Sequence, residues 1–270
     1  MHKPIEPPAY AVRPMGAVNW IGLWTLYRKE VHRFVKVIMQ TVFAPAVTTI
    51  LFFAIFMLAL GGDHRVVNGH PFAEFLVPGL VMMAIVQNSF ANTSSSLLIA
   101  KVQGNIVDLL MPPLSAGEMV LAFVAGGMTR GILVAFSVAL PLLPFVDLHL
   151  PHPFIATFFG LAASMMLSLI GLLGAVWATK FDHMAAVTNF VIMPLSFLSG
   201  TFYSIERLPA VWQVVSHFNP FFYAIDGLRY AFIGHADSSI ALGMAVMVAL
   251  NAALYAVCYW VFRRGYRLKD

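Results

Sequence analysis

The stretch that decides the fold lies at residues 72–94 and reads FAEFLVPGLVMMAIVQNSFANTS. Its first half is an apolar run, and a helix that crosses the hydrocarbon core of a membrane needs about 20 predominantly apolar residues. The strands of a membrane barrel would instead alternate apolar and polar residues over about ten positions. This stretch is continuous, so it predicts a transmembrane helix, which satisfies its own backbone groups in lipid.

The second half of the same stretch is unusually polar for a membrane span. Polar side chains inside a span usually face the interior of the helix bundle or a cavity. Two interpretations stay open: these residues hold helices together, or they line a pathway or a seam between two copies of the chain. The candidate pathway or dimer-seam residues are Gln87, Asn88, Asn92 and Thr93, together with Arg130 of a later span.

Arg130 is the most costly single residue in the predicted spans. A charged side chain at the bilayer centre costs about 2.5–3.5 kcal/mol on insertion scales, although a long side chain nearer the inner face can reach the interface. Gly126, Gly127 and Gly131 lie beside it and permit close approach of another helix. We interpret Arg130 as structural or gating, not catalytic.

The rest of the chain has the same apolar character. Of its 270 residues, 60% are hydrophobic and 10% are charged, whereas a soluble domain carries about 25% charged residues. So few charges could not cover a soluble protein, and we predict an all-α membrane protein. The six predicted spans are residues 37–60, 72–94, 119–143, 154–179, 184–203 and 239–262, within a six-helix transmembrane domain of residues 37–270.

The distribution of Lys and Arg predicts the orientation, because cytoplasmic loops carry an excess of these residues. Twelve lie on one side and only Arg65, Arg207 and Arg229 on the other. We therefore expect both termini in the cytoplasm of a multi-pass membrane protein. Basic residues at span ends, rather than in a patch, argue against a nucleic-acid partner. The twelve are Lys3, Arg13, Arg28, Lys29, Arg33, Lys36, Lys101, Lys180, Arg263, Arg264, Arg267 and Lys269.

Residues 19–36 predict an amphipathic helix that follows a flexible, proline-rich tail of residues 1–18. We expect this helix to lie in the cytoplasmic interface with its cations toward acidic headgroups. It is either a simple anchor or a helix that also touches a cytoplasmic partner. Its apolar face comprises Trp20, Leu23, Trp24, Tyr27, Val31, Phe34, Val35 and Ile38, and its polar face Arg28, Lys29, His32, Arg33 and Lys36.

The loop after the second span predicts a short helix over about residues 104–111. Asn105 can cap it, and Pro112 and Pro113 must end it. An apolar turn exposed on the cytoplasmic side is typical of a site for a protein partner, although the loop could also pack on its own bundle. Its residues are Gly104, Asn105, Ile106, Val107, Asp108, Leu109 and Leu110.

Residues 204–238 are apolar but broken by prolines and glycines, so they are not expected to form a single span. They predict an external helical hairpin that dips into the outer leaflet, because irregular backbone is tolerated there when protein buries it. Asp226 and Arg229 are three residues apart and could pair on one helix face. The residues that we single out in the hairpin are Asn219, Pro220, Asp226 and Arg229.

Signatures of catalysis are absent from the sequence. No G-x-x-x-x-G-K-[ST] loop occurs, so this chain does not cradle ATP phosphates, and no H-E-x-x-H or Cys-x-x-Cys motif occurs. The single cysteine, Cys258, cannot form an intrachain disulfide. We predict no catalytic, cofactor-binding or metal residue. Two weak clusters in external loops are interpreted as solvated polarity: Asp63, His64 and His70, and Asp147, His149 and His152.

Taken in order, several strings resemble the type-2 ABC transporter permeases (ABC-2 family), and among them the bacterial YadH-type permeases. The resemblance runs from about Trp20 to the C-terminus, and the first 18 residues lie outside it. It rests on FLVPGLVMM (75–83), NIVDLL (105–110) with Pro112 and Pro113, LSGTFYS (198–204), FNPFFY (218–223) and DGLRY (226–230).

The resemblance implies an exporter of amphipathic cargo, such as lipids, glycolipids or glycans, or drugs. It implies a homodimer with separate cytoplasmic P-loop ATPase subunits, which hold ATP and magnesium, so that this chain is not itself an enzyme. Residues 104–110 would be the coupling helix seated in the ATPase, assisted by Arg28, Lys29 and Arg33. The alternative is an ion-coupled secondary transporter, but the predicted spans hold no clearly central acid and no internal repeat.

Overall fold

The computed structural model describes residues 18–59, 66–67, 69–146 and 149–267. Within these ranges the chain is helical except for turns, loops and one antiparallel pair of two-residue strands. In chain order the elements are α1 (Trp20–Val35), the π-helical turn η1 (Met39–Phe43), α2 (Ala44–Ala59), β1 (Val66–Val67), β2 (His70–Pro71), α3 (Phe72–Val102), α4 (Ile106–Leu110), α5 (Ala116–Leu142), α6 (Pro153–Trp177), α7 (Phe181–Val187), the π-helical turn η3 (Thr188–Ile192), α8 (Met193–Leu198), the 3₁₀ turn η4 (Ile205–Arg207), α9 (Ala210–His217), α10 (Pro220–Ile233) and α11 (Ile240–Arg264).

Six segments of the described chain are long and apolar enough to cross a membrane, which confirms the predicted number. They are Met39–Ala59 (η1 with α2), Phe72–Val102 (α3), Ala116–Leu142 (α5), Pro153–Trp177 (α6), Phe181–Leu198 (α7, η3 and α8) and Ile240–Arg264 (α11).

Two of the predicted boundaries are wrong by several residues. The helix α3 continues to Val102, beyond the predicted end at residue 94, because neighbouring helices bury its polar second half. The fifth span begins at Phe181 and ends at Leu198 rather than residue 203. Gly200 adopts a φ of +78°, a conformation that turns the chain and that side chains disfavour.

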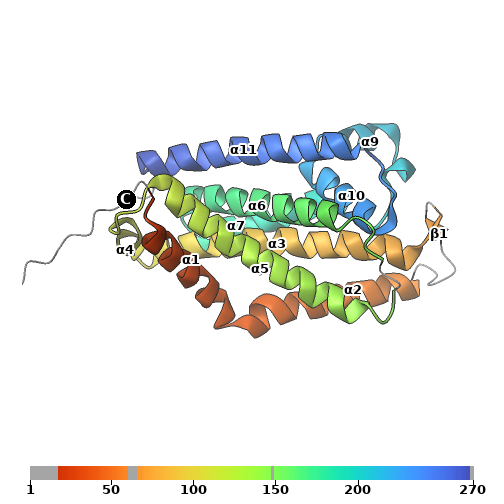
Figure 1. Ribbon diagram of the computed structural model, residues 1–270, viewed down its shortest axis with the longest axis horizontal. Coiled ribbons are helices and arrows are strands. Elements are labelled where there is room, and N and C mark those ends of the chain that lie inside the picture. The colour runs from red at the N-terminus through yellow and green to blue at the C-terminus, as the bar shows by residue number, and fades with distance from the viewer. Residues whose placement is uncertain (1–17, 60–65, 68, 147–148, 268–270) are drawn as a thin grey trace, which may run out of the picture.

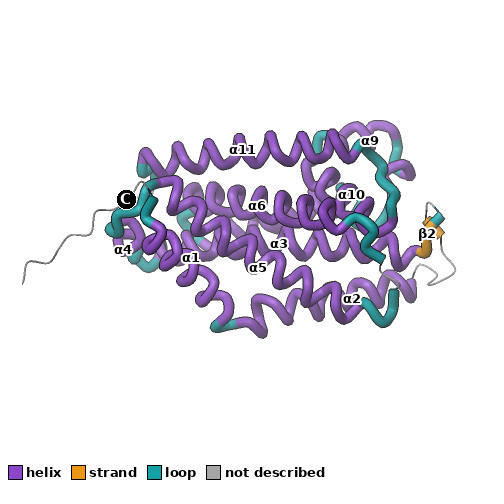
Figure 2. The backbone as a smooth tube through the Cα atoms, in the orientation of Figure 1, coloured by secondary structure: helices purple, strands orange, loops and turns teal. Residues whose placement is uncertain are grey.

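The long helices lie side by side, with α3 and α6 in the middle, α11 along one edge and α2 along the opposite edge (Figures 1 and 2). The short helix α4 and the C-terminal end of α11 lie together, at what we call the α4 end. The strands and α9 lie at the other end of the bundle, which we call the α9 end. Residues far apart in sequence thus meet at each end.

The central position of α3 follows from its packing against α5 and α6. Some 89% of its most apolar window is buried, against 17% for the first, fifth and sixth spans. Glycines on the neighbours permit this approach: a Cβ at Gly131 of α5 would collide with Ser89 of α3, and a Cβ at Gly171 of α6 would collide with Thr93 of α3. Small residues at helix contacts are the usual means of close packing in membranes.

The first and fifth spans each contain a π-helical turn. The turn η1 precedes Pro45 and the turn η3 precedes Pro194, and a proline cannot donate the usual backbone hydrogen bond to the residue four positions earlier. Such turns in membrane helices are frequent at functional sites and at bends. Both occur in spans that the chain itself buries little.

The segment before the last span forms the helical pair α9 and α10. The helix α10 packs against α6, α3 and α11, so it is part of the bundle rather than a surface loop. Asn219 caps α10 by accepting from Phe221 N at 3.1 Å. Its side-chain amide also donates to Leu195 O at 2.8 Å and Ser199 Oγ at 2.7 Å, which ties the start of α10 to the fifth span.

Candidate functional site

Two polar residues of α3 join it to α6. The Oγ atoms of Ser89 and Ser164 are 2.6 Å apart, and Thr93 Oγ1 donates to Ser168 O at 2.8 Å. Interhelical hydrogen bonds of this kind contribute about 0.6 kcal/mol each on average in a membrane protein. For Thr93 the contact therefore favours the interpretation that it holds helices together.

Arg130 of α5 is buried against the same face of α3. Its guanidinium donates to Asn88 Oδ1 at 3.0 Å, and its Nε has no hydrogen-bond partner among the described residues. The neighbouring Gly127 lies so close to Ser168 and Thr93 that a Cβ there would collide with both, which is the close approach expected from the sequence. Arg130 and Asn88, both predicted candidates, are thus in direct contact.

The predicted cationic face of α1 required Arg33 to point away from the bundle. Arg33 instead points toward α3. It donates to Asn92 O at 2.7 Å, Asn92 Oδ1 at 3.0 Å and Ser95 Oγ at 3.2 Å, all on α3. The prediction failed because the polar half of α3 offers Arg33 three acceptors inside the protein. Arg28 and Lys29 are exposed.

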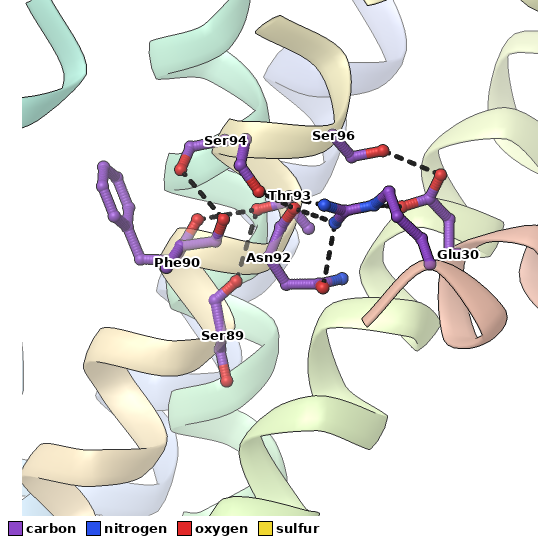
Figure 3. A network of polar contacts seen from close by, with 10 residues as sticks. Glu30, Ser89, Phe90, Asn92, Thr93, Ser94 and Ser96 are labelled. Atoms are coloured by element: carbon purple, nitrogen blue, oxygen red, sulfur yellow. Dashed lines mark hydrogen bonds and ion pairs between the residues drawn. The ribbon is translucent and has the colours of Figure 1, made fainter. Parts of the chain in front are cut away.

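Glu30 is the residue that sequence reasoning missed. Its side chain is 1% exposed, it accepts a hydrogen bond from Ser96 Oγ at 2.8 Å, and it lies 3.6 Å from Arg33 Nε (Figure 3). The buried side of α1 runs through Leu26, Glu30 and Phe34, whereas Trp20 and Trp24 of the predicted apolar face are exposed. We call Glu30, Arg33, Asn92, Ser95 and Ser96 the Glu30 cluster.

A cavity of about 380 Å³ lies between α3 and the first span, and its wall includes part of the fifth span. It is partly polar, and the Nε2 atom of Gln87 lacks a hydrogen-bond partner in the described chain. Both π-helical turns contribute to the lining. Its polar lining residues are Gln40, Thr48, Thr49, Gln87, Asn88 and Thr188.

At the α4 end, the short helix α4 buries one residue and exposes others. Leu109 is buried, whereas Val107 is 57% exposed and Met111, which follows the helix, is 75% exposed. Asn105 precedes the helix but makes no side-chain capping bond, contrary to the prediction, and its amide contacts Gln103 at 3.4 Å instead. Lys101 donates to three carbonyls at the end of α6, at 2.8–3.2 Å, which suits a cation at a helix C-terminus.

The starts of α1 and α5 are tied together by Glu118. Ser115 and Glu118 form a capping box at the start of α5, and Glu118 Oε1 also accepts from Asn19 N at 2.6 Å. The capping box is readable as S-x-x-E in the sequence, but the link to Asn19 is not. This contact fixes one end of α1 to the helix that it packs against.

At the α9 end, Asp226 and Arg229 of α10 do not form the predicted pair within the described part of the chain. Asp226 accepts from Asp237 N at 2.7 Å, Ser238 N at 2.9 Å and Ser238 Oγ at 2.6 Å. Arg229 donates to Gly200 O at 2.6 Å and lies over the ring of Phe75 at 3.8 Å. We call Gly200, Asp226, Arg229, Asp237 and Ser238 the Asp226 cluster.

Among the described residues no group of three or more His, Cys, Asp or Glu could hold a metal ion. Residues Asp63, His64 and Asp147 of the two weak clusters lie outside the described ranges. His70, His149 and His152 line one cavity of about 380 Å³ together with Glu74, and His70 Nδ1 lies 3.7 Å from Glu74 Oε2.

Comparison with known families identifies this bundle. Residues 22–233 match the ABC-2 type transporter family. The chain belongs to that family. The ABC-2 match begins in α1 and ends at the last residue of α10. It therefore includes the Glu30 cluster, the short helix α4 and three members of the Asp226 cluster, Gly200, Asp226 and Arg229.

Individual relatives agree with the ABC-2 assignment. The chain is 36% identical to the inner membrane transport permease YadH of Escherichia coli K12 over 251 residues, which cover 93% of this chain and 98% of the relative. It is 20% identical to nodulation protein J of Rhizobium leguminosarum bv. viciae over 260 residues, 94% of this chain and 97% of the relative. This ABC-2 protein is therefore a multi-pass membrane protein and the membrane subunit of an ABC transporter, and the family implies an ATPase partner.

Proposed function

We propose that this permease exports an amphipathic cargo, such as a lipid, a glycolipid or glycan, or a drug, across the bacterial inner membrane. Both termini and the α4 end lie in the cytoplasm in this proposal. ATP hydrolysis takes place on a separate P-loop ATPase, which binds ATP and magnesium, so this chain needs no cofactor. The sequence supports that division, because it contains no phosphate-binding loop.

The observation that carries the proposal is the cavity beside Gln87 and Asn88. It places amide and hydroxyl groups next to apolar walls, between the central helix α3 and the first span at the edge of the bundle. Polar groups at that depth are unfavourable unless they line an aqueous cavity or face other protein. A cargo with both polar and apolar parts has the chemistry that such a wall can accept.

The same cavity supports a homodimer. Two of the segments around it, Met39–Ala59 and Phe181–Leu198, are among the least buried spans of the described chain. A second copy packed against their exposed faces would complete the wall and leave a path between the two permeases. Gln87, Asn88, Asn92, Thr93 and Arg130 would then act near that path, by lining it or by holding α3 in position.

The surface at the α4 end would receive the ATPase. Val107 and Met111 are apolar and exposed there, and an exposed apolar turn beside cations suits a protein partner. Lys101, Val107 and Arg267 line a cavity of about 240 Å³ at this place. In this proposal Gly104 to Leu110 form the coupling helix, and the exposed Arg28 and Lys29 of α1 extend the surface.

The Asp226 cluster would keep the outer end of the bundle closed. Asn219 and Pro220 start α10 against the fifth span, and Asp226 and Arg229 hold the loops on either side of α10. In this proposal these residues form a fixed gate, and the moving parts lie at the α4 end.

An ion-coupled secondary transporter is the second candidate, and one observation favours it. Glu30 is a buried acid in contact with α3, and such transporters use buried acids for ion coupling. Membership of the ABC-2 family supports the ATP-driven function instead.

The test is an affinity pull-down of the chain from native membranes in mild detergent, followed by mass spectrometry and an ATPase assay. We expect a P-loop ATPase to co-purify with vanadate-sensitive turnover. A folded permease that carries no ATPase, and that moves cargo with a proton gradient alone, would establish the ion-coupled alternative.

A further inference from the structure

Three helices meet at Glu30. The carboxylate comes from α1 and accepts from Ser96 of α3, and its Cβ lies against Gly126 of α5. A Cβ placed on Gly126 would lie 2.7 Å from the Glu30 Cβ, so only glycine leaves room for this approach. The position of α1 on the bundle therefore depends on how well the Glu30 carboxylate is accommodated.

The Glu30 carboxylate has fewer partners than a buried charge requires. Its Oε1 accepts from Ser96, but its Oε2 has no hydrogen-bond partner among the described residues. The 3.6 Å separation from Arg33 Nε is too long for a hydrogen bond. The Arg33 side chain is 28% exposed, and its other N–H groups donate to Asn92 and Ser95. A buried ion pair with such incomplete bonding need not stabilise the fold.

Burial consequently raises the pKa of Glu30, and the opposing influence of Arg33, Ser96 and Lys29 does not cancel it. These are the charged and polar groups that face the carboxylate from α1 and α3. From α5 the contact is with Gly126, and Arg130, the charged residue of that helix near the cluster, interacts electrostatically with Arg33.

Water can reach Glu30 if α1 moves only a short way. The opposite face of α1 is exposed at Trp24, Arg28 and Lys29, so no other layer of the described protein covers it. Moving α1 away from α3 would hydrate Glu30 and favour its ionised form, whereas docking favours the neutral form. Docking and proton binding are thus linked, because each shifts the equilibrium of the other.

We propose that Glu30 is a positioning residue that holds α1 on the polar face of α3 when it is neutral and releases α1 when it is ionised. This inference does not rest on the ATPase partner, so it can be tested on the purified full chain. In this proposal the position of α1 on the bundle depends on pH.

The test is hydrogen exchange of the full chain in lipid nanodiscs, with mass spectrometry of peptides from α1 and from α10. Results are compared as protection factors, which remove the intrinsic pH dependence of exchange. In the wild type, protection of α1 should fall on the order of tenfold as the pH rises from about 5 to about 8.5, across the range above the ordinary glutamate pKa. In Glu30→Gln it should stay high and not vary with pH.

Two further variants make the result specific. Arg28→Gln removes an exposed charge of α1 that is not among those acting on Glu30, and it should leave the pH response in place. Ser96→Ala removes a hydrogen bond that favours the charged form, so the release of α1 should move to higher pH. The Ser96 variant decides the question if Glu30→Gln does not fold.

A purely structural glutamate would give a different pattern. Its replacement by glutamine would loosen α1 at every pH or leave it unchanged, and wild-type protection would not depend on pH. Either result, or a Ser96→Ala variant with an unshifted transition, overturns the proposal. None of these outcomes depends on whether an ATPase co-purifies.

Discussion

Glu30 and Arg33 of α1 have the same spacing as Asp226 and Arg229 of α10, yet the two pairs have different structures. In the Glu30 cluster the acid lies 3.6 Å from its arginine, and both residues bond to groups of α3. In the Asp226 cluster the acid and the arginine bond to different loops: Asp226 accepts from Asp237 and Ser238, and Arg229 donates to Gly200 O, while its Nε has no hydrogen-bond partner among the described residues. Equal spacing on a helix therefore does not determine whether two charges pair.

The difference lies in what surrounds each acid. Asp226 has a short side chain next to the loop after α10, whose N–H groups at Asp237 and Ser238 need acceptors. Glu30 faces another helix, where Ser96 supplies one donor. Burial raises the pKa of both acids, but Asp226 receives three hydrogen bonds and Glu30 one. The Asp226 cluster is thus suited to a fixed connection and the Glu30 cluster to a releasable one.

The largest expected effect is that of Asp226→Ala. The substitution leaves the backbone N–H groups of Asp237 and Ser238 without their acceptor, and each such buried donor costs about 1–3 kcal/mol. We expect the free energy of unfolding to fall by about 3–5 kcal/mol in a denaturant titration in mixed micelles. Asp182→Ala, at an exposed position, is the control. A loss no greater than that of the control would remove the distinction between the two clusters.

The two arginines should respond differently to the same conservative change. Arg229→Lys loses the planar group over Phe75 and weakens the bond to Gly200 O, at an expected cost of about 1.5–3 kcal/mol. Arg33→Lys should cost less than about 1 kcal/mol, because Arg33 is partly exposed to solvent. The same titration measures both variants. Equal losses would show that the two clusters contribute equally to stability.

The α4 end should matter for coupling rather than for stability. Val107→Asp places a charge on an exposed apolar position, so insertion and folding should be unchanged. We expect stimulation of the partner ATPase to fall about tenfold, equivalent to about 1.4 kcal/mol of binding free energy. Asp182→Asn, at an exposed position outside the coupling helix, should retain stimulation. Normal stimulation in Val107→Asp would argue that the partner does not use α4.

Much of this fold is predictable from the sequence, because a membrane imposes long apolar helices that local composition reveals. The end of α3 was predicted too early because Ser94, Ser95 and Ser96 resemble the end of a span. Their burial depends on α1, α5 and α6, which a local pattern does not contain. The fifth span was extended too far for a related reason, since the turn at Gly200 interrupts an otherwise apolar run.

The candidate site was less predictable for the same physical reason. The periodic pattern of α1 predicts only which residues share a face of an isolated helix. It cannot predict that Ser96, 66 positions away, donates a hydrogen bond to Glu30. The spacing of Asp226 and Arg229 suggested a pair, but the competing donors come from a loop eleven and twelve residues later. The polar half of α3 was identified correctly as unusual, although its partners could not be named.

The smallest expected effect, and the sharpest comparison, is the pH dependence of stability in Glu30→Gln. A carboxyl whose pKa is raised on folding stabilises the fold below its ordinary pKa, and this contribution is lost as the pH rises through the raised value. The glutamine variant lacks the titration. Its unfolding free energy should therefore match the wild type at low pH and exceed it increasingly at higher pH, by less than the loss in Asp226→Ala. The contribution of Asp226 is present in both proteins and cancels in the difference. A variant that becomes less stable than the wild type at high pH would show instead that the ion pair with Arg33 outweighs the burial of Glu30, and that α1 is held most firmly when Glu30 is charged.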